Sequence, residues 1–347
     1  MTIKPAPMQV LVMGAGSIGC YLGGLADTAG LDLHFVGRPR VLDSLRLHGL
    51  VCSDLTGRQH TIPAAKLQLH ERVPAGLHPA VSLLCVKSAA TAEAASELQA
   101  ALPAGGLLLS MQNGISNASA AQAAAPALDV RAGMVPFNVA ELAPGHFHRG
   151  SSGALMVQGH AAPDAALRTL QSAFAHSGIE LQLIDSAEAM RAVQWGKLLL
   201  NLNNPVNALS GLPLREQLQQ RGYRRCLAAL QAEALDVLAA AGQPVQAMTP
   251  LPPRRLLNVL RLPTPLFKLV AARMLKIDAK ARSSMADDLA LGRRTEIDAL
   301  CGEVLALARS VGVSAPLNAR MQSLVQDWPA RSRPYGPDEL LAALGLS

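Results

Sequence analysis

The stretch Q-V-L-V-M-G-A-G-S-I-G, Gln9 to Gly19, decides the fold of the first half of this chain. A short apolar strand leads into a G-x-G-x-x-G motif, and Cys20 to Gly30 then has the apolar spacing of a helix. In this context Gly14 permits a tight turn, Gly16 lets a pyrophosphate approach the backbone, and Gly19 allows the helix to pack on the strand. Because a helix N-terminus offers N–H donors to an anion, the pattern predicts a dinucleotide-binding unit.

The end of the second expected strand, Leu33 to Val36, is basic. It continues as G-R-P-R, so Arg38 stands where folds that bind NAD carry an acid for the ribose 2′-hydroxyl. Asp32 lies at the other end of the strand. A guanidinium suits a 2′-phosphate because its planar fork grips two oxygens. We therefore expect NADP, as NADPH, to be the cofactor; the alternative is that Arg38 is a solvated surface residue.

Three further apolar segments predict that the sheet continues: Val81 to Val86, Leu107 to Met111, and Val130 to Val139. Lys87 directly follows the first segment, and Asn113 follows the second within the tripeptide Q-N-G. Ligands bind beyond the carboxyl ends of parallel strands, so we expect Lys87 and Asn113 to lie where cofactor and substrate meet. The alternative is that both are ordinary loop residues.

The other segments of the first half are assigned from shorter patterns. Leu45 to Ile62 has the pattern of a loop and hairpin. We expect His146 to Arg149 and Ala154 to Gln158 to be antiparallel strands, Asp164 to Ser177 to be a helix, and Ile179 to Ile184 to be the last strand.

Beyond that strand, the pattern changes to helix after helix. We expect residues 1–185 to form an α/β N-terminal Rossmann-type dinucleotide-binding domain and residues 186–347 to form an all-α C-terminal domain. The second domain would hold the substrate and the catalytic groups. Leu256 to Lys276 is expected to be helical with a break at Pro263 and Pro265.

One helical stretch carries an unusual polar stripe: W-G-K-L-L-L-N-L-N-N-P-V-N-A-L, Trp195 to Leu209. On a continuous helix Lys197, Asn201 and Asn204 share a narrow face. Leucines occupy the other directions, which predicts a buried helix whose polar stripe faces a cavity. The alternative is a satisfied lysine and amide network inside the domain. Pro205 cannot donate to the carbonyl of Asn201, so we expect a kink there.

Two later segments have the polar residues of helix starts. Ser283 or Ser284 is expected to cap a helix that runs through Asp287. Thr295, just before Glu296, is expected to begin another helix, whose first turn is favoured by acidic residues.

Composition excludes several classes of protein. The net charge is +6, but no basic run is interleaved with aromatic residues, which argues against nucleic-acid binding and suits small anionic ligands. The five cysteines are scattered, so we expect reduced thiols and no zinc site. We find no targeting pattern and no apolar run of membrane-spanning length, and we expect a cytoplasmic protein without a metal.

With these motifs assembled, the chain resembles the ketopantoate reductase family (2-dehydropantoate 2-reductases) from Gln9 to about Val325. The shared motifs are G-A-G-S-I-G, the arginine after the second strand, V-K, Q-N-G, W-x-K-L-x-x-N, and S-S-M-x-x-D followed by T-E-I-D. Glu296 falls twelve residues after Ser284, as in the family pattern. The resemblance implies NADPH-dependent reduction of 2-dehydropantoate to (R)-pantoate, a step toward pantothenate.

The resemblance also implies roles for the residues in the helical half. Lys197 would be the catalytic acid, and Glu296 would contact cofactor and substrate and help to place that lysine. Ser284 would bind the substrate carboxylate, while Asn201 and Asn204 would hold substrate oxygens.

In the first half, Asn113 would lie between nicotinamide and substrate. Val139 would contact the nicotinamide amide through its backbone. The implied cofactor-binding residues are Gly14, Ala15, Gly16, Ser17, Ile18, Gly19, Arg38, Lys87, Asn113, Val139 and Glu296.

The chain departs from the family pattern in two places. The segment from Lys197 to Pro205 is one residue shorter than the commonest spacing, and a later family asparagine is replaced by Leu214 or Arg215. A reductase of another small 2-keto acid therefore stays open as an alternative, as does a non-catalytic NADP-binding protein. An all-helical second domain is also compatible with a homodimer.

Overall fold

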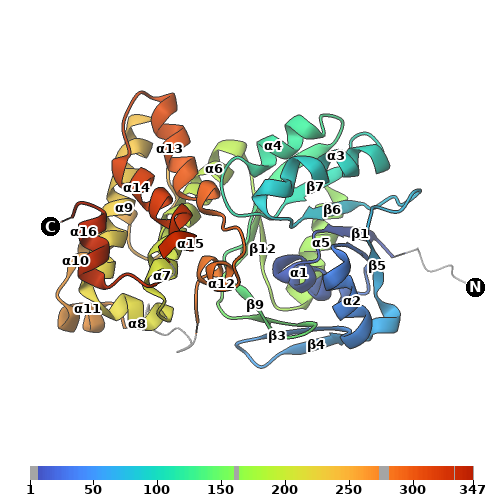
Figure 1. The fold of residues 1–347 in the computed structure, drawn as a ribbon. Coiled ribbons are helices and arrows are strands. Elements are labelled where there is room, and N and C mark those ends of the chain that lie inside the picture. The colour runs from blue at the N-terminus through green and yellow to red at the C-terminus, as the bar shows by residue number, and fades with distance from the viewer. Residues whose placement is uncertain (1–6, 160–163, 273–280, 332, 347) are drawn as a thin grey trace, which may run out of the picture. The chain divides into compact units, whose positions relative to one another are not determined.

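The structure is a computed structural model that describes residues 7–159, 164–272, 281–331 and 333–346. It divides into two compact units after Met190, a sheet-containing unit and a helical one (Figure 1). The prediction of an α/β Rossmann-type domain followed by an all-α domain is confirmed. The domain boundary was expected after residue 185, whereas the division into units falls inside the first helix of the second half, α6 (Ala187–Asn201).

The larger sheet of the first unit has eight strands within the described residues, in the order β12-β11-β8-β7-β6-β1-β2-β5. All neighbours are parallel except β8 and β11. The strand order reverses at β1, because β2 lies on one side of it and β6 on the other. Ligands of such sheets bind at this reversal, beyond the carboxyl ends of the strands. The strands are β1 (Gln9–Met13), β2 (Asp32–Val36), β5 (Gln68–His70), β6 (Val81–Leu84), β7 (Leu107–Ser110), β8 (Asp129–Met134), β11 (Leu155–Gln158) and β12 (Leu181–Ile184).

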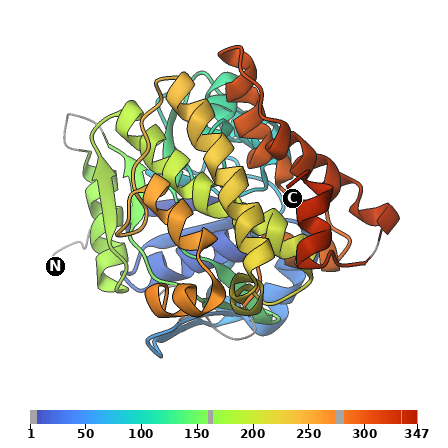
Figure 2. The ribbon, with the colours of Figure 1, turned by 90° about the vertical axis from the view of Figure 1, so that its left-hand side faces the viewer.

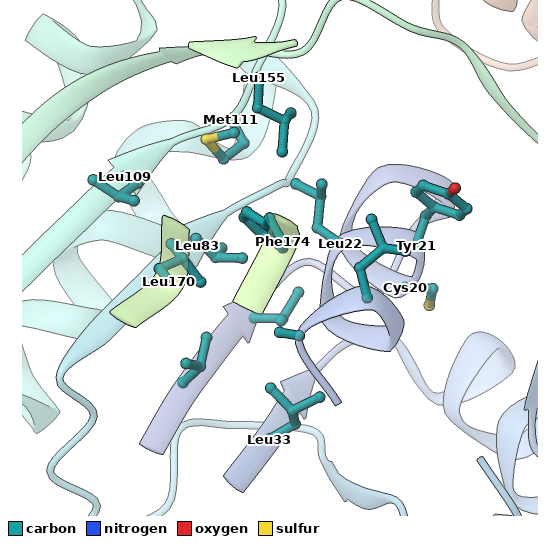
Figure 3. Packing of buried hydrophobic residues seen from close by; sticks show 14 of the residues in the cluster. Cys20, Tyr21, Leu22, Leu33, Leu83, Leu109, Met111, Leu155, Leu170 and Phe174 are labelled. Atoms are coloured by element: carbon teal, nitrogen blue, oxygen red, sulfur yellow. The ribbon is translucent and has the colours of Figure 1, made fainter. Parts of the chain in front are cut away.

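Strand β1 supplies side chains to two separate cores because successive residues point to opposite faces. Val10 and Val12 pack with α1 (Ser17–Asp27) and α5 (Ala165–His176), in the core drawn in Figure 3. Leu11 and Met13 pack on the other face. There α3 (Thr91–Ala101) and α4 (Asn117–Ala124) cover the sheet. Such continuous burial on both faces is typical of a parallel sheet with helices on each side.

A second, four-stranded sheet in the order β4-β3-β10-β9 was only partly predicted. It contains β3 (Leu50–Asp54), β4 (Gln59–Ile62), β9 (Val139–Ala143) and β10 (His146–Arg149). The expected hairpin within Leu45 to Ile62 is confirmed, but the first part of that segment is the end of helix α2 (Pro39–His48) rather than a loop.

One predicted strand is divided in the structure, and two strands that were expected to be antiparallel pair with other neighbours. Val130 to Val139 is not one strand: β8 ends at Met134, and Val139 begins β9 in the other sheet. Pro136 lies between them and has no N–H for a ladder hydrogen bond. His146–Arg149 and Leu155–Gln158 do not pair with each other, because β10 is antiparallel to β9 and β11 is antiparallel to β8.

The helical unit is built around α9 (Arg221–Ala240), which packs against α10, α14 and α16 (Figure 2). The predicted break at Pro263 and Pro265 is confirmed, since α10 ends at Arg261 and α11 begins at Thr264. The far end of that predicted segment, Lys276, lies outside the described residues. The other elements are α7 (Asn203–Ser210), α8 (Leu214–Gln219), α10 (Pro253–Arg261), α11 (Thr264–Val270), α12 (Ser284–Ala290), η3 (Ile297–Ala299), α13 (Cys301–Ser310), α14 (Pro316–Gln326), α15 (Trp328–Arg331) and α16 (Pro337–Ala343).

A search of the described ranges finds no helix that is long and apolar enough to cross a membrane. The five cysteines are free thiols, and in those same ranges no three acidic, histidine or cysteine side chains form a group suited to a metal ion.

Candidate active site

In the glycine loop between β1 and α1, each glycine is required, or not required, for a different geometric reason. Gly14 has a φ of 109°, and a Cβ there would lie 2.7 Å from the amide nitrogen of Val86. A Cβ on Gly19 would collide with the carbonyl oxygen of Gly14 and lie 2.9 Å from a methyl carbon of Val12. The predicted tight turn and close packing of helix on strand are therefore present in the backbone itself.

Gly16 is the exception, because a Cβ built on it meets no atom within 4 Å in the described part of the chain. Steric crowding inside the protein therefore does not require glycine here. Gly16 is the N-cap residue of α1, whose first residues are Ser17 and Ile18. Since the first N–H groups of a helix lack intrahelical partners, this open approach to the backbone fits the phosphates of a dinucleotide.

Two basic residues follow β2 and β6, the two strands that lie on either side of β1 in the sheet. Arg38 follows β2 as the N-cap residue of α2, and Lys87 follows β6 as the N-cap residue of the short 3-10 turn η2 (Ser88–Ala90). Both are exposed. The Arg38 guanidinium has no hydrogen bond or ion pair to any residue that the structure describes, so it is available to an external anion.

A buried polar network holds the loop after β7 in place, and no sequence motif predicted it. Gln112 is 9% exposed, and its amide nitrogen donates to the carbonyl of Val86 at 2.9 Å and to the hydroxyl of Thr91 at 2.7 Å. Its amide oxygen accepts the hydroxyl of Ser110 at 2.9 Å. Gln112 therefore ties the end of β7 to the end of β6.

Asn117 extends this network to the predicted site residue Asn113. Its side-chain oxygen accepts the hydroxyl of Thr91 at 3.0 Å, and its nitrogen donates to Ser88 at 3.0 Å and to the carbonyl of Asn113. Asn113, as predicted from Q-N-G, thus lies in a loop held by side chains from two strand ends. Only the tertiary structure shows that these polar residues share one network.

In the helical unit, the polar stripe falls on two helices rather than one. Helix α6 ends at Asn201, Leu202 is in a turn, and α7 begins at Asn203. The helix is thus interrupted just before Pro205, although Leu202 keeps right-handed helical angles; the kink expected from Pro205 stays a prediction. The amide of Gln231 donates to the carbonyl of Leu199 at 2.8 Å, which satisfies one carbonyl in the last turn of α6.

The burial pattern along this stretch separates polar from apolar residues. Lys197, Asn201 and Asn204 are partly buried, whereas most of the leucines around them are buried. Desolvation by burial lowers the pKa of Lys197 to about 8. A lysine with that pKa is still mostly protonated at neutral pH and gives up its proton more readily than an exposed lysine.

The two adjacent serines have different surroundings. Ser283 is the N-cap residue of α12: its hydroxyl accepts the N–H of Ala286 at 3.2 Å and donates to the carbonyl of Asn204 at 3.2 Å. Ser284 is exposed, and its hydroxyl has no hydrogen bond within the described ranges. The capping predicted for one of these serines is therefore done by Ser283.

Glu296 is partly buried and precedes η3, where its carbonyl accepts the N–H of Ala299 at 3.0 Å. The helix start predicted at Thr295 falls within two residues of a 3-10 turn that begins at Ile297, rather than at an α-helix. Glu296 is the N-cap residue of a single 3-10 turn, and α13 follows only after Leu300, whose φ of −117° and ψ of −88° are not helical.

The predicted residues thus form two groups, one in each compact unit. In the first unit, the glycine loop, Arg38, Lys87 and Asn113 follow β1, β2, β6 and β7, which are neighbours in the sheet. Val139 is the first residue of β9, a strand of the other sheet, and packs against the same core cluster as Ile18. In the second unit, Ser284 begins α12, which packs on α7, the helix of Asn204.

Comparison with known proteins finds, along most of the chain, the same family that the sequence motifs resemble. Residues 10–161 match the family described as ketopantoate reductase PanE/ApbA, and residues 189–328 match its C-terminal part. A 2-dehydropantoate 2-reductase of Halobacterium salinarum is 30% identical over 324 residues, which cover 92% of this chain and 98% of that protein.

Solved structures of similar fold include members of the same family. A PanE/ApbA family ketopantoate reductase from Ralstonia eutropha JMP134 has a TM-score of 0.74 and 27% identity, over 92% of this chain and 97% of the other. D-mandelate dehydrogenase, solved with NADH and anilino(oxo)acetate, shares the fold with a TM-score of 0.73 at 18% identity, over 92% of this chain and 97% of that one.

The Rossmann-type unit, the helical unit after it and the family matched by both make this chain a two-domain oxidoreductase. The chain belongs to the ketopantoate reductase PanE/ApbA family.

Proposed function

We propose that this protein reduces the ketone of 2-dehydropantoate to the alcohol of (R)-pantoate, with NADPH as cofactor and Lys197 as general acid. The observation that carries the proposal is the match to the ketopantoate reductase family along both units, together with Lys197 lying partly buried on α6 at the position of the family lysine. Burial also lowers the pKa of Lys197 to about 8, in the direction that suits a proton donor. Membership of the family and the names of its curated relatives support the choice of substrate.

The chemistry explains why such a lysine is useful. When a ketone carbon accepts hydride, negative charge develops on the oxygen, and a nearby acid lowers the barrier. Bound NADPH supplies the hydride. The Lys197 ammonium donates a proton to the carbonyl oxygen, which completes the hydroxyl group, and the neutral amine then recovers a proton from solvent. A proton donor is most effective when its pKa is near the working pH.

The other site residues are assigned to binding. Ser284 donates its hydroxyl to the substrate carboxylate, and Asn201 and Asn204 donate amide N–H groups to substrate oxygens. Glu296 contacts cofactor and substrate and orients Lys197. Asn113 separates the nicotinamide from the substrate.

The cofactor assignment rests on the first unit. The backbone from Gly14 to Gly19 receives the pyrophosphate at the open position of Gly16. Arg38 grips the 2′-phosphate, Lys87 supplies a second positive charge, and Val139 contacts the nicotinamide amide through its backbone. The exposed guanidinium of Arg38, at the end of β2, supports NADPH over NADH.

A reductase of another 2-keto acid is the second candidate. The shared fold of D-mandelate dehydrogenase and the shortened segment before Pro205 favour keeping it. We also propose a cytoplasmic homodimer, since a Staphylococcus aureus ketopantoate reductase of similar fold is described as dimeric; sedimentation of the purified protein tests this assembly.

The deciding experiment measures NADPH oxidation with a panel of 2-keto acids that includes 2-dehydropantoate and aromatic members. We expect the highest kcat/KM for 2-dehydropantoate and (R)-pantoate as the product. High turnover of another acid with none of 2-dehydropantoate would select the second candidate. A panel without any turnover would refute both.

A further inference from the structure

Asn207, three residues beyond Asn204 on α7, is a fully buried carboxamide that no sequence motif singled out. Its side-chain oxygen accepts the backbone N–H of Ser283 at 2.9 Å, and its nitrogen donates to the carbonyl of Leu212 at 2.8 Å. Both partners are backbone groups. Asn207 therefore joins the start of α12 to the loop that follows α7.

The segment before α12 is held to the same region by further hydrogen bonds. The N–H of Leu214 donates to the carbonyl of Ala281 at 2.8 Å, and the hydroxyl of Ser283 donates to the carbonyl of Asn204 at 3.2 Å. Together with the bond from Asn207, three hydrogen bonds run between residues 281–283 and the stretch 204–214. They fix the backbone of Ser283 against α7.

This arrangement determines the position of the next residue, Ser284. Ser283 uses its hydroxyl for the cap of α12 and for Asn204, so it is occupied by the protein. Ser284 is the first residue of α12 and presents an exposed hydroxyl. Because the two serines are joined by one peptide bond, any group that holds the Ser283 backbone also sets where the Ser284 hydroxyl can lie.

We propose that Asn207 is a positioning residue that places Ser284 relative to Asn204 and thereby sets the affinity for the substrate carboxylate. The inference rests on the proposed function, in which Ser284 and Asn204 bind the 2-keto acid. Asn207 does not touch the substrate; it acts through the Ser283 backbone. Loss of its carboxamide leaves a buried N–H without its partner, and the start of α12 then shifts to regain a hydrogen bond.

Two substitutions separate positioning from simple stability. Asn207→Leu keeps the approximate size and removes both hydrogen bonds. Asn207→Asp restores them only when protonated, because a neutral carboxyl has one acceptor for Ser283 and one O–H donor for Leu212. Burial favours the protonated form of such a carboxyl, so the aspartate variant has a built-in pH readout.

We expect Asn207→Leu to raise the KM for 2-dehydropantoate roughly tenfold, which corresponds to the loss of one well-placed hydrogen bond. Its kcat and its KM for NADPH should stay within about twofold of the wild type. For Asn207→Asp, the ratio of its KM to that of the wild type should fall as the pH is lowered from 8 to 6. Amide hydrogen exchange of a peptide covering residues 281–291 should be faster in Asn207→Leu.

Asn318→Leu is the matched control, because Asn318 is another fully buried carboxamide of this unit, with hydrogen bonds to Leu230 and Glu233 of α9. It should leave the KM for the keto acid within about twofold. An active Asn207→Leu enzyme with wild-type KM would overturn the inference, as would an Asn207→Asp enzyme whose KM is as high as that of Asn207→Leu at every pH, because a carboxyl can still accept the N–H of Ser283. A wild type that turns over no 2-keto acid would instead overturn the proposed function.

Discussion

Asp54 and Arg149 form an ion pair between β3 and β10, with 3.0 Å from Oδ2 to Nη2, although each residue is only 7% exposed. Burial raises the pKa of Asp54, but hydrogen bonds from Thr56 and Arg58 and the charge of Arg149 outweigh it and hold the pKa below its ordinary value. Arg149 is also the register partner of Val139, the first residue of β9 and a predicted cofactor contact. The ion pair therefore helps to hold the strand that pairs with β9.

Removing one partner of this pair should destabilise the first unit. We expect Asp54→Ala to lower the free energy of unfolding by about 3 kcal/mol, because it leaves a buried guanidinium without its counter-ion. Urea denaturation measures this. The double variant Asp54→Leu with Arg149→Met should recover part of the loss, and an equal loss in single and double variants would contradict the argument. Since the pKa of Asp54 is lowered on folding, its contribution is present above the unfolded pKa and is lost as the pH falls through the folded one.

The glycine loop allows function and stability to be separated by two single substitutions. Gly16→Ala should leave the melting temperature within about 2 °C, because the new methyl group meets open space, and it should raise the KM for NADPH at least tenfold by blocking the phosphate approach. Gly19→Ala should instead lower the melting temperature by several degrees, because its methyl group collides with the Gly14 carbonyl. Thermal unfolding and initial rates test both; equal effects on binding and stability would refute the distinction.

Arg38 should decide between the two nicotinamide cofactors. We expect Arg38→Ala to raise the KM for NADPH more than tenfold and to change the KM for NADH by less than about twofold, because only NADPH carries the 2′-phosphate. Arg40→Ala is a useful control, since Arg40 is also exposed but lies inside α2. Steady-state kinetics with both cofactors suffices, and parallel changes in the two KM values would remove Arg38 from phosphate recognition.

Lys197 should produce opposite pH effects on activity and on stability. Activity should fall as the pH rises through about 8, where the folded lysine loses the proton that it donates. Because burial lowers its pKa from 10.5, the unfolded chain binds more protons between pH 8 and 10.5, and the contribution of Lys197 to stability rises over that range.

Lys197→Met tests both effects in one variant. It should reduce kcat at least a hundredfold while NADPH still binds, and its unfolding free energy should lack the rise above pH 8 that the wild type shows. Rate profiles and chemical denaturation at several pH values measure these quantities. A variant with wild-type kcat would exclude Lys197 from the proton transfer.

Local pattern sufficed to predict the dinucleotide-binding unit. The strand at Gln9–Met13, its glycines and its helix follow from short-range rules, and Lys87 and Asn113 were placed by the rule that ligands lie at strand ends. Of the second sheet, only the hairpin of β3 and β4 was predicted as a pair, because β3 pairs in parallel with β10, which lies far along the chain. When two paired strands are this far apart in the sequence, no local sequence pattern identifies the partner of either strand.

The same limit applies to the helical half of the site. Lys197 and Asn201 could be chosen from spacing on one helix. Ser283 was one of two candidates for the cap of α12, but its hydrogen bonds to Asn204 and Asn207 could not be predicted, because these partners are distant in sequence and only the tertiary structure brings them near. The residue type asparagine does not by itself indicate whether its side-chain amide is buried or exposed.

The interruption at Leu202 has a consequence for how this family can vary in length. In an unbroken helix, deleting one residue rotates everything beyond it by about 100° and would turn the later polar residues away from the earlier ones. Leu202 keeps right-handed helical angles, and its N–H still donates to the carbonyl of Leu198 at 2.9 Å, so the interruption between α6 and α7 is slight. The orientation of α7 is held in addition by its own contacts with α9 and α12. Because the helix is already interrupted at Leu202, we expect a one-residue insertion or deletion next to it to be tolerated better than the same change inside either helix.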